Sequence, residues 1–499
     1  MPKHKSTKNL SEIGKFFKNN DASNAMFNIL RTINSLRLPE KVLFGRKSRC
    51  NQVYSLLNVF VCLLIGPCFM IRNPYNYDGS PLSGFLGCKK DVFYGFLRDV
   101  RINWRKLMYH INLQLWTRIE VRSDHKDRTT CLIVDDTDFP KTGRRMERIG
   151  RVHSHLEHRS ILGFKALFLG ITDGVSQMLL DFALVGEKGR KENYGMSQKE
   201  LDARYAPERN EEATASKRIK EYDKDKITLA MDMVREAIRK GIRFQYLLAD
   251  SWFTCKEIIR FVHSRRIKCH YLGCIKVGEK GKTKYHFDKN DFTAPALIRH
   301  LNKKDTKKYS RKLRCWYITA DVKFAGISCR MFFVRRSKHG KWSGLITTNT
   351  GLDFFEAYRI YAQRWSQEVV FKESKGLLGL GKCQAKDFAE QIAHTSIVAL
   401  QYNILSLVKR FNDYETIGGL FREVEKESIE LTIAERIWQL IMETVISFAT
   451  IFGLTDEEVL EVVVKQSDEL AHICRTFNLK VSLLGPTGIV RGRRSVKLS

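Results

Sequence analysis

Two short apolar runs that each end in aspartate constrain the fold of this chain most. They are residues 131–136 (CLIVDD) and residues 246–250 (YLLAD). A continuous apolar run of this length is typical of a strand that is buried on both faces. An Asp at the end of such a strand lies at the sheet edge, where α/β proteins form their sites. We therefore expect an α/β core with carboxylates at one edge, although each Asp taken alone is more typical of a simple cap on the next helix or turn.

A third element concentrates charge on one face. The stretch 354–375 contains neither Gly nor Pro and is followed by Gly376, which predicts a single helix. Five of its polar side chains share an arc of about 60° or slightly more at helical spacing: Tyr361, Arg364, Glu368, Lys372 and Lys375. A solvated face laced with salt bridges is the ordinary interpretation of such a helix. Trp365 and Phe371 among the charges, and the strand-end Asp residues upstream, favour a site instead.

The acidic side chains of the three elements suggest a metal centre. Asp136, Asp250 and Glu368 would repel one another if they converged, unless they shared cations. Carboxylate oxygens are hard ligands that suit Mg²⁺ or Mn²⁺. We therefore expect these three residues to be both the catalytic residues and the metal ligands.

The order of these residues resembles a known signature. The spacing Tyr-x2-Arg-x3-Glu-x6-Lys, which begins at Tyr361, is similar to that of cut-and-paste DDE transposases encoded by bacterial insertion sequences. Asp136-Thr137 resembles the first catalytic motif of that family, and residues 248–253 (LADSWF) resemble the second. Residues 162–174, followed by 181–184, look like the hairpin between the two motifs. The resemblance covers roughly residues 125–390.

The resemblance implies a DNA transposase. Such an enzyme binds the terminal inverted repeats of its element, cuts the DNA ends through a hairpin intermediate and joins them to target DNA. Two divalent ions about 3.5–4 Å apart would activate a water or a 3′-hydroxyl for in-line displacement. Asp135 and Asp138 are rivals for the first ligand position. Asp136 is preferred because the family pattern places Thr directly after the ligand.

The remaining signature residues are expected to bind DNA. Tyr361, Arg364 and Lys375 would hold phosphates near the cleavage point, with Lys372 as a helper. Trp365 is expected to pack in the core or to support the helix. Trp316, or Trp342, would stack on a flipped base, as the resemblance suggests, although a place in a hairpin core is an equal alternative for Trp316.

The charge balance points to the same class of partner. The chain of 499 residues holds 86 Lys and Arg against 55 Asp and Glu, a net charge of +31. Such an excess is typical of a protein that binds a polyanion, with double-stranded DNA first and an acidic membrane surface second. Residues 53–71 approach the length of a membrane span but are broken by Gly66-Pro67, so we expect a buried helix and no span.

Two other site chemistries are weaker. The His153, His155 and His158 cluster could hold zinc but lacks a Cys or acidic partner at a convincing spacing. We therefore expect this segment to be a loop that faces DNA. Ser251 and Cys255 follow Asp250, but no His near them in sequence would activate a nucleophile. The twelve Cys contain no Cys-x2-Cys pair, and residues 1–6 are not followed by an apolar core. Both features are typical of a cytoplasmic protein with reduced thiols.

The chain divides into five expected segments. They are a helical DNA-binding domain (1–120), the first part of a ribonuclease-H-like core (125–274), a basic β-strand insertion (275–340), the second part of the core (341–387) and a C-terminal helical domain (388–499). The insertion holds 18 Lys and Arg against 5 Asp and Glu. The C-terminal domain is a candidate for dimerisation, and we expect a homodimer on DNA. A nuclease of the same fold, or a DNA-binding relative that does not transpose, remains the alternative function.

Overall fold

The structure is a computed structural model. It describes residues 25–428 apart from 46–53, 70, 72, 79, 81–87, 123–126, 211–212, 265–266, 279–281, 305, 338 and 413. The chain forms two compact units. One comprises the described parts of Met1–Asn103, Leu377–Gly379 and Ile404–Ser499, and the other comprises Trp104–Gly376 and Leu380–Asn403. The sequence after residue 428, including most of the expected C-terminal domain, lies outside the described residues.

The first unit is helical where it is described. Its labelled helices are α2 (Ala25–Asn34), α3 (Glu40–Phe44), α4 (Leu56–Ile65), α6 (Lys90–Leu97) and the short 3-10 turns η1 (Gly66–Phe69) and η2 (Pro74–Tyr77). The rings of Phe44 and Phe96 pack edge to face with centroids 5.4 Å apart. The Glu427 carboxylate accepts hydrogen bonds from the backbone N–H groups of Ala25 and Met26 at 2.9 and 2.8 Å, at the N-terminus of α2.

Helix α4 corresponds to the segment that approached membrane length. It ends at Ile65, before the Gly66-Pro67 break that the sequence predicts. Within the described part of the chain, no helix has both the length and the apolar character that crossing a membrane requires.

The second unit is built on one mixed sheet. Its strands are β1 (Cys131–Pro140), β2 (Gly150–Ser154), β3 (Arg159–Thr172), β4 (Gln177–Val185), β5 (Tyr246–Ala249), β6 (His270–Ile275), β7 (Lys284–Phe287), β8 (Asn290–Thr293), β9 (Lys308–Ser310), β10 (Cys315–Phe324), β11 (Ile327–Arg335) and β12 (Ser343–Thr347). The order is β2-β3-β1-β5-β6-β12-β11-β10-β7-β8, with β4 also on β3 and β9 also on β10. β1, β5 and β6 are parallel to one another, whereas β1 is antiparallel to β3. The expected α/β class is confirmed.

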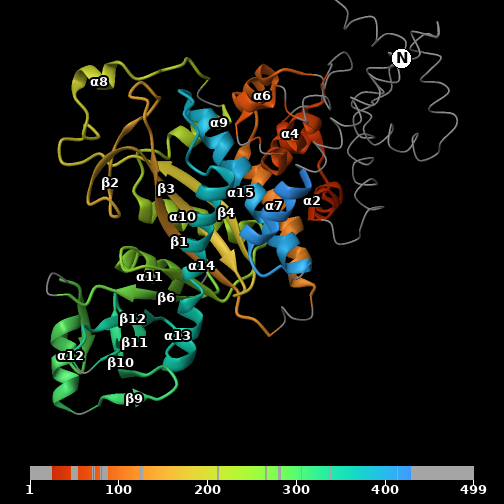
Figure 1. Ribbon diagram of the computed structural model, residues 1–499. Coiled ribbons are helices and arrows are strands. Elements are labelled where there is room, and N and C mark those ends of the chain that lie inside the picture. Colours follow the sequence, from red (N-terminus) through yellow and green to blue (C-terminus); the bar gives the residue numbers. More distant parts are fainter. Residues whose placement is uncertain are drawn as a thin grey trace, which may run out of the picture. The chain divides into compact units, whose positions relative to one another are not determined.

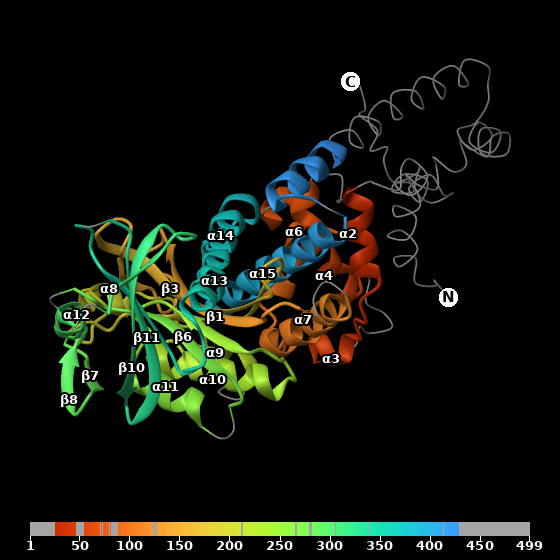
Figure 2. The ribbon, with the colours of Figure 1, turned by 90° about the horizontal axis from the view of Figure 1, so that it is seen from below.

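Helices cover both faces of this sheet. They are α7 (Trp104–Glu120), α8 (Gln198–Asp202), α9 (Thr214–Ile219), α10 (Lys226–Arg239), α11 (Lys256–His263), α12 (Ala294–Lys303), α13 (Phe354–Ala362), α14 (Trp365–Glu373) and α15 (Phe388–Phe411), the last continuing into the first unit. Figure 2 shows α10 and α11 on one side of the strands and α13 and α14 on the other. The strand-end carboxylates therefore have a different helix pair on each face.

Several local predictions are confirmed. The Asp173-Gly174 turn joins β3 and β4, and Gly174 has a φ of +85°, which suits glycine. The expected β insertion contains β7 to β11 together with α12, which was not expected. These strands continue the same sheet through the pairing of β11 with β12 and of β12 with β6, and they gather with α12 at the lower end of Figure 1.

Two predictions about helices and loops are wrong. The stretch 354–375 is not one helix, because α13 ends at Ala362 and α14 begins at Trp365. The N–H groups of Gln363 and Arg364 bond to carbonyls three residues back, which tightens the turn between the two helices. The segment with His153, expected to be a loop, contains strand β2.

A partly buried histidine in α15 makes the second unit sensitive to acid. The Nδ1 of His394 is buried and has no hydrogen-bond partner among the described residues. Burial, and secondly the Lys141 ammonium, lower the pKa of His394 to about 4. Between about pH 6.5 and pH 4, His394 is therefore protonated in the unfolded chain but neutral in the folded chain. The free energy of unfolding consequently falls as the pH falls through this range.

We expect this histidine to cost up to about 3 kcal/mol of stability between pH 7 and pH 4. Urea unfolding of the wild type and of His394→Leu at both pH values measures the difference. The loss on acidification should be smaller in the variant by that amount. Identical losses in the two proteins would show that His394 titrates normally.

Candidate functional site

Strand β1 presents alternate side chains to opposite faces of the sheet. Cys131 and Ile133 pack with Ala357 and Ile360 of α13 in one core cluster. Because side chains alternate along a strand, Asp135 points to this same face. The adjacent Asp136 points to the other face, where its Oδ2 accepts from Lys226 Nζ at the start of α10, at 2.5 Å. The two neighbouring carboxylates therefore belong to different environments.

The register of the sheet brings Asp135 beside Asp250. β1 and β5 are parallel, and their last paired residues are Val134 and Ala249. Asp135 directly follows Val134, and Asp250 directly follows Ala249, so the two Asp residues lie side by side at the ends of adjacent strands. The Asp250 Oδ1 also accepts from the backbone N–H of Trp252 at 2.9 Å, which orients the carboxylate at the end of its strand.

Arg364 joins β1 to α14. Its guanidinium donates through Nη1 to Asp135 Oδ2 at 3.0 Å and through Nη2 to Glu368 Oε1 at 2.5 Å. The side chains of Arg364 and Asp135 are each 16% exposed, and that of Glu368 is 36% exposed. The guanidinium thus neutralises two carboxylates that come from separate elements in a poorly solvated place.

Asp135 is the most perturbed acid of this group. Burial raises its pKa to about 7, and the negative charges of Asp250 and Asp136 add to the rise, while the Arg364 guanidinium opposes it. Asp135, Asp250, Glu368 and Arg364 consequently form one electrostatic cluster, which we call the acidic cluster. A buried carboxyl group with a raised pKa beside other carboxylates is typical of a functional site.

The other signature residues differ in their contacts and in how far they are buried. Lys375 Nζ donates to Thr137 Oγ1 at 2.7 Å, on the same face of β1 as Asp135, and burial lowers the pKa of Lys375. Tyr361 is partly buried against the core cluster, and burial raises the pKa of its hydroxyl. Lys372 is exposed on α14. Trp365 is 62% exposed, so the expectation that it packs in the core is wrong.

Asp138 and Trp316 lie in other surroundings. Asp138 forms an ion pair with the buried Lys165, whose Nζ also donates to the His153 carbonyl. Trp316 on β10 packs against Tyr309 of β9, with ring centroids 4.9 Å apart, and Lys307 Nζ lies 5.2 Å from its ring.

The structure also bears on the weaker site chemistries. The rings of His153 and His155 lie 5.1 Å apart at centroid. Across the described residues, no three His, Cys, Asp or Glu side chains stand close enough to hold a metal ion in this conformation. Burial raises the pKa of the Cys255 thiol, which disfavours the nucleophilic thiolate.

The acidic cluster nevertheless has the chemistry of a divalent cation site. Its donors are carboxylate oxygens, the ligand type that Mg²⁺ and Mn²⁺ prefer. Burial, more than the neighbouring carboxylates, raises the pKa of Asp135, and a bound cation would favour the charged form of that carboxyl group. Arg364 already bridges two of the three acids as a cation. The residue types therefore suit such an ion, and the three carboxylates would have to move closer together to share one.

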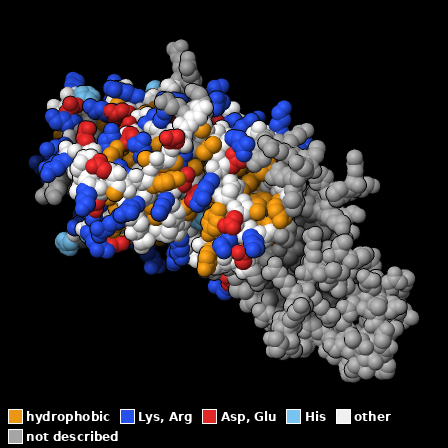
Figure 3. Space-filling model, turned by 90° about the horizontal axis from the view of Figure 1, so that it is seen from above, with side chains coloured by type: hydrophobic (Ala, Val, Ile, Leu, Met, Phe, Trp, Pro, Cys, Tyr) orange, Lys and Arg blue, Asp and Glu red, His pale blue; other side chains and the backbone are white. Residues whose placement is uncertain are grey.

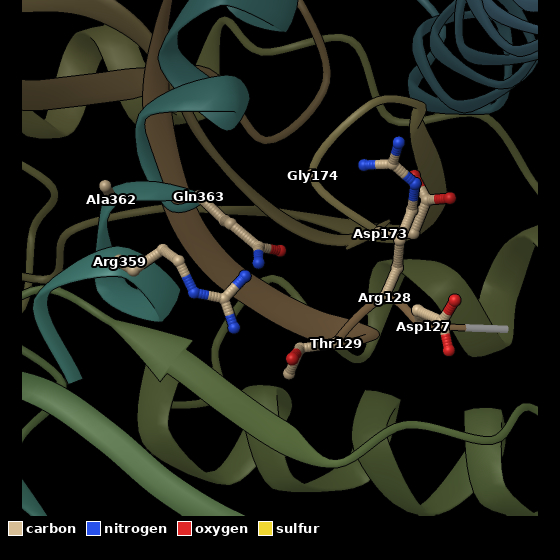
Figure 4. Close-up of a pocket in the computed structure, with 8 residues that line it drawn as sticks. All are labelled: Asp127, Arg128, Thr129, Asp173, Gly174, Arg359, Ala362 and Gln363. Atoms are coloured by element: carbon tan, nitrogen blue, oxygen red, sulfur yellow. The ribbon is translucent and has the colours of Figure 1, made fainter. Parts of the chain in front are cut away.

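A separate pocket of about 650 Å³ opens near the start of β1, away from Asp135. It is lined by Asp127, Arg128, Thr129, Asp173, Gly174, Arg359, Ala362 and Gln363. Figure 4 shows Arg359 and Gln363 projecting from the α13 side toward Thr129. Two arginines and two aspartates leave its lining without net charge, so the pocket does not select for a polyanion.

Comparison with known proteins links part of the chain to one family. Residues 81–276 match the model of the DDE superfamily endonucleases. The matched segment includes both strand-end Asp residues and ends before Glu368. A comparison with curated proteins found no match. A solved structure, the cryo-EM structure of the piggyBac transposase synaptic complex with hairpin DNA, is similar with 11% identity and a TM-score of 0.41, over 86% of this chain and 81% of that chain.

Proposed function

We propose that this protein is a DDE transposase of the kind encoded by bacterial insertion sequences. It binds the terminal inverted repeats of its element as a dimer, cleaves both ends through a hairpin intermediate and joins them to target DNA. The observation that carries the proposal is that Arg364 joins Asp135 to Glu368, while Asp250 follows β5 in register beside Asp135. The match of residues 81–276 to DDE superfamily endonucleases supports it.

In this proposal the core of the enzyme is ribonuclease-H-like. Strands β4, β3 and β1 form the antiparallel half, and β5 and β6 continue parallel to β1. The catalytic acids are Asp135, Asp250 and Glu368, so Asp135 replaces Asp136 as the first ligand. The replacement follows from the alternation of β1, which turns the Asp136 carboxylate to Lys226 on the other face.

Two divalent ions, Mg²⁺ or Mn²⁺, would be held by these three acids, and when bound they would activate a water or 3′-hydroxyl and stabilise the leaving oxygen. Arg364 and Lys375 would hold phosphates of the DNA end. Arg364 is suited to this because a guanidinium binds a phosphate with the same two-pronged hydrogen-bond geometry with which it binds a carboxylate. Tyr361 supports Arg364 from 5.8 Å, its ring beneath the guanidinium.

The charge of the protein suits DNA. Figure 3 shows one face on which Lys and Arg side chains outnumber Asp and Glu, in keeping with the net charge of +31. A DNA duplex laid on such a surface releases its condensed counterions, which favours binding at low salt.

The test begins with the DNA that flanks the gene. Imperfect inverted repeats should bracket it, and a duplex carrying one repeat should be cut in the presence of Mg²⁺ or Mn²⁺. Denaturing gels resolve nicked, hairpin and flush-cut species, and a supercoiled target plasmid reports joining. Cleavage without hairpin or joining would make the protein a nuclease, and binding without cleavage would make it a DNA-binding relative.

Replacing Arg364 separates its two roles. In Arg364→Ala the acidic cluster loses a competing cation, so Mn²⁺ should bind the DNA-free protein more tightly, by about tenfold or ~1.4 kcal/mol. Hairpin formation and joining should fall more than the first nick, because those steps need a second phosphate held in place. Calorimetric Mn²⁺ titration and time-resolved gels measure the two effects.

Arg330→Ala is the matched control for Arg364. Arg330 forms a forked pair with Asp321 within the insertion. Its loss should leave Mn²⁺ affinity unchanged. Weaker Mn²⁺ binding by Arg364→Ala, or equal loss at every DNA step, would mean that Arg364 holds the site together instead of competing with the ions.

A further inference from the structure

A second pocket opens where the insertion meets α13. Its volume is about 370 Å³, within the range of small-molecule sites. It lies at one end of three adjacent strands, since β10 begins at Cys315, β11 ends at Arg335 and β12 begins at Ser343. These strands, the loop between β11 and β12, the segment before β10 and helix α13 supply its lining: Leu313, Cys315, Val334, Arg336, Ser337, Gly340, Lys341, Ser343 and Tyr358.

The buried part of this lining is apolar. Cys315 and Val334 belong to the core cluster beneath α13, and Leu313 and Tyr358 pack against the same cluster. The Tyr358 ring lies 6.2 Å from the ring of Phe354, centroid to centroid, so an aromatic wall stands on the α13 side. A ligand that fills the pocket gains free energy by covering this apolar part with an apolar or flat group.

The exposed part of the lining is basic. Arg336 and Lys341 are exposed, and no carboxylate of the described residues forms an ion pair with either of them. The nine residues that line the pocket include no Asp or Glu. The pocket near the start of β1 differs, because its two arginines are balanced by two aspartates. Two uncompensated cations at the mouth of a small pocket attract an anion.

The loop that carries these two cations is held by contacts of its own. The Arg335 guanidinium lies 4.6 Å from the centroid of the Trp342 ring, which joins the two ends of the loop. Within the loop, the backbone N–H of Gly340 donates to the Ser337 carbonyl at 3.1 Å. The cations are therefore held at the end of the sheet, beside the apolar part of the pocket.

We propose that this pocket binds a phosphate monoester joined to an apolar or aromatic group, which is the chemistry of a mononucleotide. A monoester carries roughly 1.5 to 2 negative charges near pH 7, which matches the two cations. Its terminal oxygens accept from the forked guanidinium of Arg336, from the ammonium of Lys341 and from the hydroxyl groups of the lining. The group attached to the phosphate covers the apolar part beside Tyr358.

The proposal goes beyond the proposed function, because the site uses neither the acidic cluster nor a metal ion. A backbone phosphate of duplex DNA is a diester with a single charge, so it matches the two cations less well. Two sources share the monoester chemistry: a free mononucleotide and the 5′-phosphorylated end of a DNA strand. Either ligand connects the β11–β12 loop to α13, so binding should raise the melting temperature of the protein.

Calorimetric titration of the full chain, without DNA or metal, measures the affinity. The probes are adenosine monophosphate, adenosine and inorganic phosphate. Adenosine monophosphate should bind at least about tenfold more tightly than either of the others, because only it occupies both parts of the pocket. Equal affinity for adenosine monophosphate and inorganic phosphate would overturn the proposal, since simple attraction of an anion to a basic protein would then account for binding.

A double variant with a matched control locates the ligand. Arg336→Ala/Lys341→Ala should lower the affinity for adenosine monophosphate by about tenfold or more. Arg299→Ala/Lys303→Ala removes the same two charges from α12, where both side chains are exposed and neither lines the pocket. Its affinity should stay within about twofold of the wild type. Equal losses in the two double variants would disprove a site at this pocket.

Variants of Tyr358 test the apolar part. Tyr358→Ala should keep the affinity for inorganic phosphate and remove most of the advantage of adenosine monophosphate, whereas Tyr358→Phe should retain that advantage. An unchanged advantage in Tyr358→Ala would contradict the assignment of the aromatic wall. Thermal unfolding identifies any variant that fails to fold. If Tyr358→Ala is one of them, the two surface double variants decide.

Oligonucleotides separate the two sources of the ligand. A single strand is compared with and without a 5′-phosphate, in the wild type and in Arg336→Ala/Lys341→Ala. A gain of about tenfold from the phosphate, lost in the double variant, supports the strand end as the ligand. No gain, together with pocket-dependent binding of adenosine monophosphate, supports a free nucleotide. If neither probe shows pocket-dependent binding, this inference falls, while the cleavage assay still decides the proposed function independently.

Discussion

Replacing Asp135 with Asn should reduce DNA strand cleavage by roughly 10²–10³-fold, the scale on which a principal stabilising group of a transition state is lost. Asp135 pairs with Arg364 and neighbours Asp250, and its pKa is raised to about 7 by burial and, to a smaller extent, by Asp250 and Asp136. Asn keeps the shape but removes the charge that would hold a divalent ion. Rates of cleavage of a terminal-repeat duplex measure the loss.

Asp136→Asn is the matched variant one residue along the strand. Its carboxylate pairs with Lys226 on the opposite face, away from Arg364 and Glu368, so its loss should slow cleavage only several-fold. Mn²⁺ affinity of the DNA-free protein should fall in Asp135→Asn and stay unchanged in Asp136→Asn. The reverse order, with Asp136→Asn inactive and Asp135→Asn active, would restore Asp136 as the first ligand.

Removing Asp181 should destabilise the second unit by about 3–5 kcal/mol, as expected when one partner of a buried ionic network is lost. Asp181 is 1% exposed, and its Oδ1 accepts from Arg105 Nε at 2.8 Å and from the backbone N–H of Phe182 at 2.8 Å. The buried Arg218 lies 3.5 Å from the same oxygen. Asp181→Ala removes a negative charge that compensates the Arg105 and Arg218 guanidiniums, which remain buried away from water.

Chemical denaturation of Asp181→Ala, compared with Asp321→Ala, tests this expectation. Asp321 also pairs with an arginine, Arg330, at 2.7 Å, but it is 60% exposed. Its loss should cost only about 0–1 kcal/mol. If the two variants lost equal stability, burial would not be what makes the Asp181 network costly to break.

The sequence predicted the elements of the site better than the faces on which they meet. The two strands, their terminal Asp residues and the charged stretch before Gly376 were all evident from local pattern. Whether Asp135 or Asp136 is the first ligand was not evident from local pattern. The run 131–134 is apolar at every position and buried on both faces, so it has no amphipathic phase to show which face receives the helices. The packing of Ile133 against α13 reveals it, as do the pairing of Asp135 with Arg364 and of Asp136 with Lys226.

The break between α13 and α14 escaped prediction for a related reason. Residues 363 and 364 are neither Gly nor Pro, so the sequence does not mark the turn. The turn is closed by backbone hydrogen bonds from Gln363 and Arg364, and the Arg364 side chain there contacts Asp135 on β1. A contact between residues so distant in sequence leaves no local signal. Trp365 was misplaced for a similar reason, since Val370 and Phe371 occupy the buried side of α14 and leave the indole in solvent.

The continuity of the sheet from β6 through β12 to β11 has a mechanical consequence. An insertion joined to the core only by flexible loops could move relative to it. Here the backbone hydrogen bonds between β6, β12 and β11 resist such movement. The insertion is thereby held in fixed register with β5, the strand that Asp250 follows. Excision of residues 275–340 would not leave a trimmed enzyme. It would remove β11, one of the two strands paired with β12, and expose the edge of β12 to pairing between molecules.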